Sequence, residues 1–160
     1  MIQNKQELFD AITSLGFPKN LLKIWDSEVP AQIHHVLQEP SRLFDAFLAY
    51  PEAFPSSDEL VILWETNGDS IVGFLRDSGV FVRHYLERGP TQVDVLGSTY
   101  QQMISECIAN LIAREVADDE LRECADFLDF QYLEQLKDFV YNDSGWEENT
   151  AAFIEGIEAS

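Results

Sequence analysis

Basic residues, cysteines and long apolar segments are all scarce in this sequence. It has 10 Lys or Arg among 160 residues, against 29 Asp or Glu, so the formal net charge is −19. Binding to a phosphate backbone or to an anionic membrane surface requires clustered cations. The longest purely apolar runs, such as residues 60–64, are far shorter than the ~20 residues that span a bilayer. We therefore expect no direct contact with nucleic acid and no membrane contact.

Cysteine usage and the start of the sequence favour a reducing compartment. Cys107 and Cys124 are the two cysteines, they form no CxxC pair, and both have apolar neighbours at helical spacing. Such thiols are typical of buried free cysteines. The opening residues, MIQNKQELFDAITSLGF, place polar and acidic side chains where a signal peptide has its apolar core. These features predict a cytoplasmic protein.

No catalytic or ligand-binding motif stands out. The sequence contains no phosphate loop, dinucleotide fingerprint, nucleophile elbow or HExxH zinc motif. His34 and His35 are adjacent and would point about 100° apart on a helix, so they do not form a chelating pair. His84 falls on the apolar side of an expected strand. We therefore predict no catalytic residue, no metal site and no cofactor.

Apolar periodicity divides the chain into three parts. Residues 1–50 follow a helical period, residues 60–97 have the β-branched and aromatic runs of strands, and residues 98–158 return to the helical period. This order, on a chain of 160 residues, predicts a single α+β domain with C-terminal helices packed on a sheet.

The strand part is expected to be an antiparallel meander of three to four strands. Two tight-turn signals, Asn67-Gly68-Asp69 and Asp77-Ser78-Gly79, separate its three main runs, and residues 93–96 supply a short fourth strand. On the helical side, Pro30 and Pro40 bracket one expected helical segment. Ser98 or Thr99 is the expected N-cap of the first helix after the sheet. A later helix is expected to run without a break from Asp118 to about residue 141.

Acidic residues concentrate in the last part of the chain. Residues 1–90 hold 13 acids and 7 bases, whereas residues 91–160 hold 16 acids and 3 bases. Such a run is either a solvated helix face or a surface that attracts a cationic partner. In the second interpretation, the partner-binding residues are Asp118, Asp119, Glu120, Glu123, Asp126 and Asp129, with Trp146 as an aromatic anchor.

The middle of the chain resembles the SUKH superfamily, which groups yeast cell-wall assembly regulators with bacterial immunity proteins. The resemblance rests on residues 63–69 (LWETNGD), residues 71–74 (IVGF) and residues 95–100 (VLGSTY), and it covers about residues 40–115. It implies helices before and after a β-meander. It also implies a binding role, commonly the neutralisation of a cognate toxin that is often a nuclease.

Together these features predict a non-enzymatic immunity protein that blocks a basic toxin domain by stoichiometric binding through an acidic surface. A regulatory or scaffold module for a cellular partner is the first alternative. A carboxylate-dependent hydrolase is the second, because 29 acids offer many carboxylate pairs. The sequence leaves the oligomeric state open.

The charge imbalance predicts that salt stabilises the fold. Raising the ionic strength from about 0.01 M to about 0.15 M shortens the Debye length from about 30 Å to about 8 Å, which weakens repulsion among the carboxylates. We expect the thermal unfolding midpoint at pH 7 to rise over this range. A midpoint that stays constant or falls would contradict the prediction.

Overall fold

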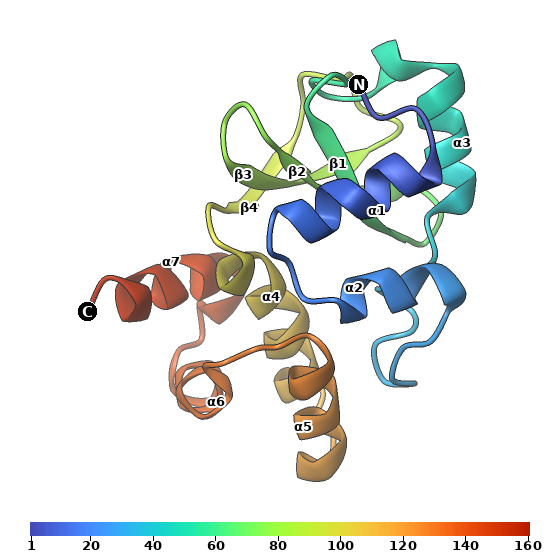
Figure 1. Ribbon diagram of the computed structural model, residues 1–160. Coiled ribbons are helices and arrows are strands. Elements are labelled where there is room, and N and C mark those ends of the chain that lie inside the picture. Colours follow the sequence, from blue (N-terminus) through green and yellow to red (C-terminus); the bar gives the residue numbers. More distant parts are fainter.

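The computed structural model describes all of residues 1–160 and has an α+β fold, as the sequence predicts (Figure 1). Seven α-helices accompany one antiparallel sheet of strand order β1-β2-β3-β4. The α-helices are α1 (Lys5–Ser14), α2 (Asn20–Lys23), α3 (Ser41–Ala49), α4 (Tyr100–Ala113), α5 (Asp118–Phe127), α6 (Leu133–Asn142) and α7 (Trp146–Glu158). The strands are β1 (Leu60–Thr66), β2 (Ser70–Leu75), β3 (Val80–Tyr85) and β4 (Asp94–Gly97), and two 3-10 turns are η1 (Ile24–Asp26) and η2 (Pro51–Ala53).

The meander and its turns form where the sequence predicts them. Asn67 and Gly68 have φ angles of 55° and 70° at the β1–β2 turn, and Gly79 has a φ angle of 68° before β3. Asn and Gly adopt this left-handed region at little cost, which makes them favourable residues for tight hairpins. β4 is short and pairs only with β3, so it forms one edge of the sheet.

One face of the sheet packs against α4. Phe74 of β2 and Phe81 of β3 have ring centroids 4.8 Å apart on this face. Phe17, which follows α1, contacts both rings, and Tyr100 at the start of α4 contacts Phe81. Met103, further along α4, is also buried. This aromatic cluster fixes the distance between α4 and the sheet.

The opposite face packs against η2 and α3. His84 of β3 is fully buried there, with Nε2 3.2 Å from the carbonyl oxygen of Ala53 and its ring beside Phe54. The sequence prediction of a core histidine is therefore confirmed. Because both faces are covered, β1 is buried over six of its seven residues and lacks the alternation of a half-exposed strand.

The expected helix between Pro30 and Pro40 is wrong. Residues 31–36 form successive turns, and Gln38 then pairs with Glu65 through two backbone hydrogen bonds of 3.0 and 3.1 Å. Pro40 disfavours a helical conformation at the residue before it, and the free edge of β1 offers hydrogen bonds that an extended segment can use. The loop consequently lies along β1.

The expected continuous helix from Asp118 to about residue 141 is also wrong, because α5 ends at Phe127 and α6 begins at Leu133. Asp129 has a φ angle of 53° at the break. The start of α4 holds the break in place: Tyr100 Oη donates to the carbonyl of Leu128 at 2.8 Å. Carbonyl groups at a helix end need such partners. The break also turns Leu128 into the core, where it is fully buried.

The last three helices pack on α4. Phe139 of α6 and Phe153 of α7 stack with centroids 4.2 Å apart and planes 6° from parallel. Thr99 is the N-cap of α4, one of the two expected candidates, and its hydroxyl also donates to Glu158 of α7 at 2.8 Å. Figure 1 shows α5 and α6 on the side of α4 away from the sheet, with α7 beside the start of α4. No helix has the combination of length and apolar character needed to cross a membrane.

Gly73 provides a test of the close packing inside the meander. A Cβ atom at this position would lie 2.8 Å from Leu60 Cδ1 and 2.9 Å from the carbonyl oxygen of Val61. We expect Gly73→Ala to lower the free energy of unfolding by about 1–3 kcal/mol, because the backbone of β1 would have to shift. Urea unfolding followed by circular dichroism measures the change.

Gly156→Ala in α7 is the matched control, since a Cβ atom there has no neighbour within 4 Å. Alanine favours a helix over glycine, so this variant should gain about 0.5 kcal/mol. Loss of stability in both variants, or in neither, would contradict the steric account of Gly73.

Candidate functional site

The acidic residues predicted to bind a partner are all exposed. Five of them lie on α5, whose buried side consists of Leu121, Cys124 and Ala125. Asp119, Glu123 and Asp126 recur at i, i+4 and i+7, so they form one ridge opposite the buried side. Asp118 and Glu120 flank this ridge, and Asp129 follows in the break between α5 and α6.

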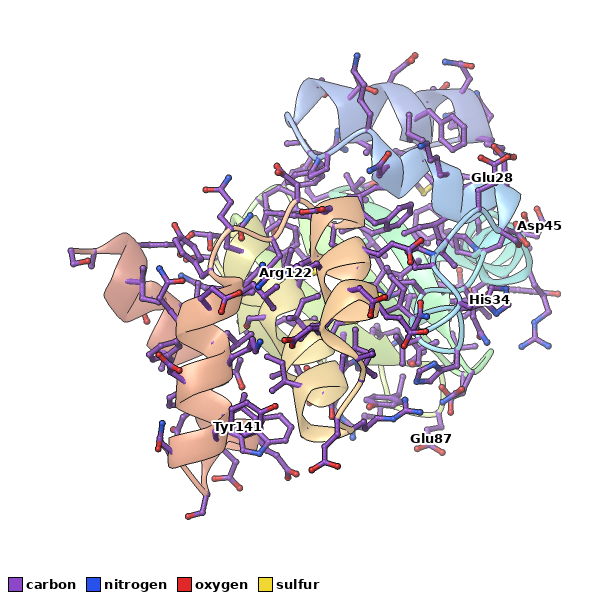
Figure 2. All side chains as sticks on the ribbon, turned by 90° about the horizontal axis from the view of Figure 1, so that it is seen from below. Glu28, His34, Asp45, Glu87, Arg122 and Tyr141 are labelled. Atoms are coloured by element: carbon purple, nitrogen blue, oxygen red, sulfur yellow. The ribbon has the colours of Figure 1, made fainter.

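The two cations of this region are already paired with other acids. Lys137 Nζ lies 2.8 Å from Asp118 Oδ1, and this hydrogen bond lowers the pKa of Asp118. Arg122 Nη2 lies 2.8 Å from Glu134 Oε1, and Figure 2 shows Arg122 on the side of α5 that faces α6. Exposed pairs of this kind add little stability. Because Lys137 and Arg122 are paired with other acids, no cation lies within ion-pair distance of the α5 ridge of Asp119, Glu123 and Asp126.

A shallow groove of about 560 Å³ runs between α5 and the segment that follows α2. Glu123 and Asp126 line one wall, while Lys23 and Glu28 line the other. Asn20 Nδ2 bridges the two walls by donating to the carbonyl of Phe127 at 2.9 Å. Glu28 thus joins the acidic surface. The sequence analysis missed Glu28 because it lies in a different helical part, and no local pattern connects it to α5.

Trp146 does not lie on the α5 ridge. It is the first residue of α7, is half-buried and packs against the hydrophobic core. The sequence analysis placed it in a polar stretch between helices, whereas α7 begins at this residue. α7 packs mainly on α4 and α6. The structure therefore brings together the acids of α5 and adds Glu28, but it does not place the indole among them.

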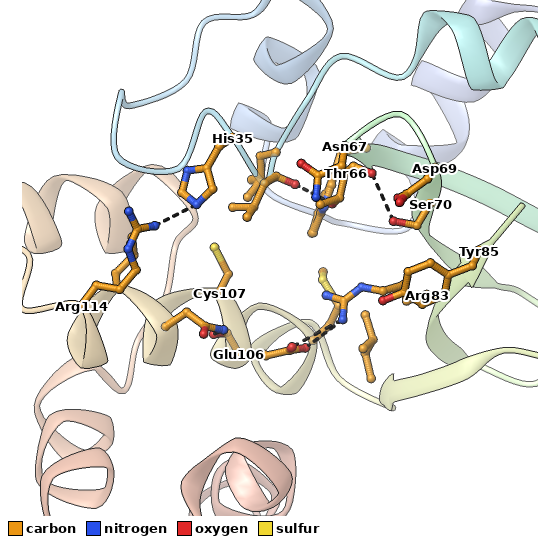
Figure 3. Close-up of a pocket in the computed structure, with 17 residues that line it drawn as sticks. His35, Thr66, Asn67, Asp69, Ser70, Arg83, Tyr85, Glu106, Cys107 and Arg114 are labelled. Atoms are coloured by element: carbon orange, nitrogen blue, oxygen red, sulfur yellow. Dashed lines mark hydrogen bonds and ion pairs between the residues drawn. The ribbon is translucent and has the colours of Figure 1, made fainter. Parts of the chain in front are cut away.

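A second hollow, of about 330 Å³, lies between the sheet and α4 (Figure 3). Its apolar floor includes Leu37, Trp64, Met103, Cys107 and Leu111. The polar groups around it come from the loop before α3, the β1–β2 turn, β3 and α4. Because four separate segments contribute, neither spacing nor periodicity in the sequence predicts this pocket.

Two arginines flank the pocket from different elements. Arg83 of β3 lies 3.4 Å from both carboxylate oxygens of Glu106 on α4. Arg114, the C-cap of α4, has Nη1 2.9 Å from Nε2 of His35 and has no carboxylate within 4.0 Å. Figure 3 shows these two pairs at opposite ends of the pocket, with Cys107 between them.

The two cysteines are free thiols, as the sequence predicts. Burial raises the pKa of Cys107 to about 12 and that of Cys124 to about 11. A thiol is nucleophilic as its thiolate, so both side chains behave as packing groups near neutral pH. Cys107 therefore contributes apolar surface to the pocket.

One carboxylate outside both hollows has a perturbed pKa. Glu65 is 8% exposed, and burial raises its pKa, with a further increase from the charge of Glu39 and an opposing effect from Arg42. Its side chain lies near the start of α3 and lines neither the groove nor the pocket. No three His, Cys, Asp or Glu side chains are placed to hold a metal ion together.

Comparison of this chain with protein-family models, with curated proteins and with solved structures finds no match. The resemblance of residues 40–115 to the SUKH superfamily therefore stays a prediction from the sequence.

The high pKa values of the cysteines predict slow alkylation. At pH 8, the thiolate fraction should make iodoacetamide labelling about a thousandfold slower at Cys107 and about a hundredfold slower at Cys124 than for ordinary thiols. Mass spectrometry of the labelled peptides measures both rates, and the chain unfolded in urea is the reference. Labelling of either cysteine in the folded protein at the unfolded rate would contradict the prediction.

Proposed function

We propose that this protein is a non-enzymatic binding protein that takes a basic protein partner on the acidic surface of α5. The observation that supports the proposal best is the ridge of Asp119, Glu123 and Asp126, which is exposed and has no cation partner. Glu28 extends the same negative charge across the groove beside α5. Carboxylates in such an arrangement accept hydrogen bonds from the Lys and Arg side chains of a partner.

Charge acts here mainly on recognition and on the rate of association. A surface of one sign steers an oppositely charged partner and can raise the association rate by about 10–10³-fold at low salt. The groove then offers three acids, Glu28, Glu123 and Asp126, against the one cation Lys23, to a basic side chain that enters between its walls. A partner that uses basic residues to hold phosphates would have those residues occupied and its substrate excluded.

The biological setting that we propose is immunity in the cytoplasm against a cognate toxin, a nuclease being the class of toxin that fits best. The acid surplus and the resemblance of residues 40–115 to the SUKH superfamily support this setting. A regulatory or scaffold module would use the same surface for a different basic partner. A carboxylate-dependent hydrolase would instead need two free acids converging in a cleft, and of the two acids that line the pocket, Glu106 is paired with Arg83 at 3.4 Å, which leaves Asp69.

Charge reversal tests the proposed surface. The triple variant Asp119→Lys, Glu123→Lys and Asp126→Lys changes the net charge from −19 to −13. We expect it to weaken binding of a basic toxin domain captured with this protein at low salt by at least about a hundredfold, because like charges then face each other. Calorimetry measures the affinity, and co-expression with the toxin shows whether growth is restored.

The matched control reverses Asp45, Glu52 and Glu87, which are exposed, make no side-chain hydrogen bond or ion pair, and change the net charge equally. Figure 2 shows Asp45 and Glu87 at the right of the molecule, away from Arg122 of α5. The control should retain affinity within about fivefold at 0.15 M salt, because distant charges are screened. Equal loss in both variants would refute the α5 surface, and the absence of any complex at low salt would refute the immunity proposal.

A further inference from the structure

The pocket between the sheet and α4 has the dimensions and the floor of a small-molecule site. Its volume is about 330 Å³, within the roughly 300–1,000 Å³ that such sites occupy. Leu37, Met103 and Leu111 are nearly fully buried beneath it, and Trp64 is 5% exposed. The apolar surface that a ligand can reach comes from partly exposed lining residues such as Val36 and Cys107, in a hollow too small for a folded partner.

Arg114 is the cation of the pocket that lacks a carboxylate partner. Its Nη1 lies 2.9 Å from His35 Nε2. One N–H of the guanidinium is used in this contact, and no carboxylate lies within ion-pair distance. An arginine without a carboxylate, in a chain with 29 acids, leaves most of its donors available to an anion in the pocket.

The other charged groups of the pocket determine which charge pattern a ligand must have to fit it. Glu106 neutralises Arg83 across 3.4 Å, and Figure 3 shows this pair at the end of the pocket away from Arg114. Asp69 also lies toward that end, beside the β1–β2 turn. Positive charge is consequently concentrated where Arg114 meets the apolar floor, whereas the opposite end is neutral or negative. A ligand that matches this pattern has one anionic end and an apolar body.

We propose that this pocket binds a small organic monocarboxylate whose carboxylate pairs with Arg114 and whose apolar body lies over Val36 and Cys107. The planar guanidinium can hold a carboxylate through two parallel hydrogen bonds. Arg114 is exposed at the rim of the pocket, so the carboxylate pairs with it there while the apolar body extends toward the floor. The pocket is separate from the acidic groove of α5, so this proposal does not depend on the partner proposed above.

Displacement of a fluorescent probe tests the pocket. Anilinonaphthalene sulfonate is anionic and apolar, and its fluorescence rises when it moves from water into an apolar site. We expect one bound probe per chain, displaced by octanoate and displaced much less by octanamide, its uncharged analogue. Arg114→Gln should weaken the binding of octanoate by about tenfold or more and should leave that of octanamide unchanged.

Lys19→Gln is the matched control, because it removes one positive charge at an exposed residue that forms no ion pair. It should bind octanoate like the original protein. Cys107→Leu narrows the pocket and should weaken probe and octanoate alike, with an unchanged circular dichroism spectrum as the measure of folding. Equal displacement by octanoate and octanamide, equal loss in the Arg114 and Lys19 variants, or full binding in a folded Cys107→Leu variant would each overturn the proposal.

Discussion

Helix α4 must be buried on nearly all of its sides, and the rest of the structure is arranged around that requirement. Ile104, Ile108 and Leu111 lie along one side of the helix, while Ala109 and Ile112 lie along another, and all five are at most 2% exposed. A helix that is apolar around its circumference is stable in water only when other elements cover it. The sheet covers one side of α4, and α5, α6 and α7 cover the other. Two hydrogen bonds connect the start of α4 to these helices. Tyr100 donates to the carbonyl of Leu128 after α5, and Thr99 donates to Glu158 at the end of α7.

The helices that cover α4 expose their outer faces to water, and the composition of the chain makes those faces negative. The last part of the sequence has only three basic residues, and Arg122 and Lys137 are used in pairs between α5 and α6. Asp119, Glu123 and Asp126 therefore keep their charge without a local counter-ion. The solvated face of α5 and the proposed binding surface are the same surface. A binding role is favoured because Glu28 lies on the opposite wall of the groove beside α5 and adds a further carboxylate to this surface.

The same helix also forms a site of opposite character. Where α4 diverges from the sheet, the loop before α3 and the β1–β2 turn enclose a pocket in which Arg83 and Arg114 are the two cations. The acidic surface of α5 and the exposed Arg114 at the rim of an apolar pocket bind different molecules. A basic protein is attracted to α5, whereas a small anion must pass a negative exterior and gains its binding energy from Arg114 and from the pocket floor. The two proposals can therefore be tested separately.

Local patterns in the sequence determined the α+β class, the meander and its turns, because these depend on neighbouring residues. Asn67-Gly68 and Gly79 favour positive φ angles wherever they occur, and Thr99 can cap α4 through its own hydroxyl. The tertiary structure decided what periodicity could not. The free edge of β1 held Gln38 in an extended segment, and the side chain of Tyr100 stabilised a break at Leu128 inside a helical pattern. The partly buried place of Trp146, the joining of Glu28 to α5 and the pocket around Arg114 likewise depend on contacts between segments far apart in the chain, which no local pattern specifies.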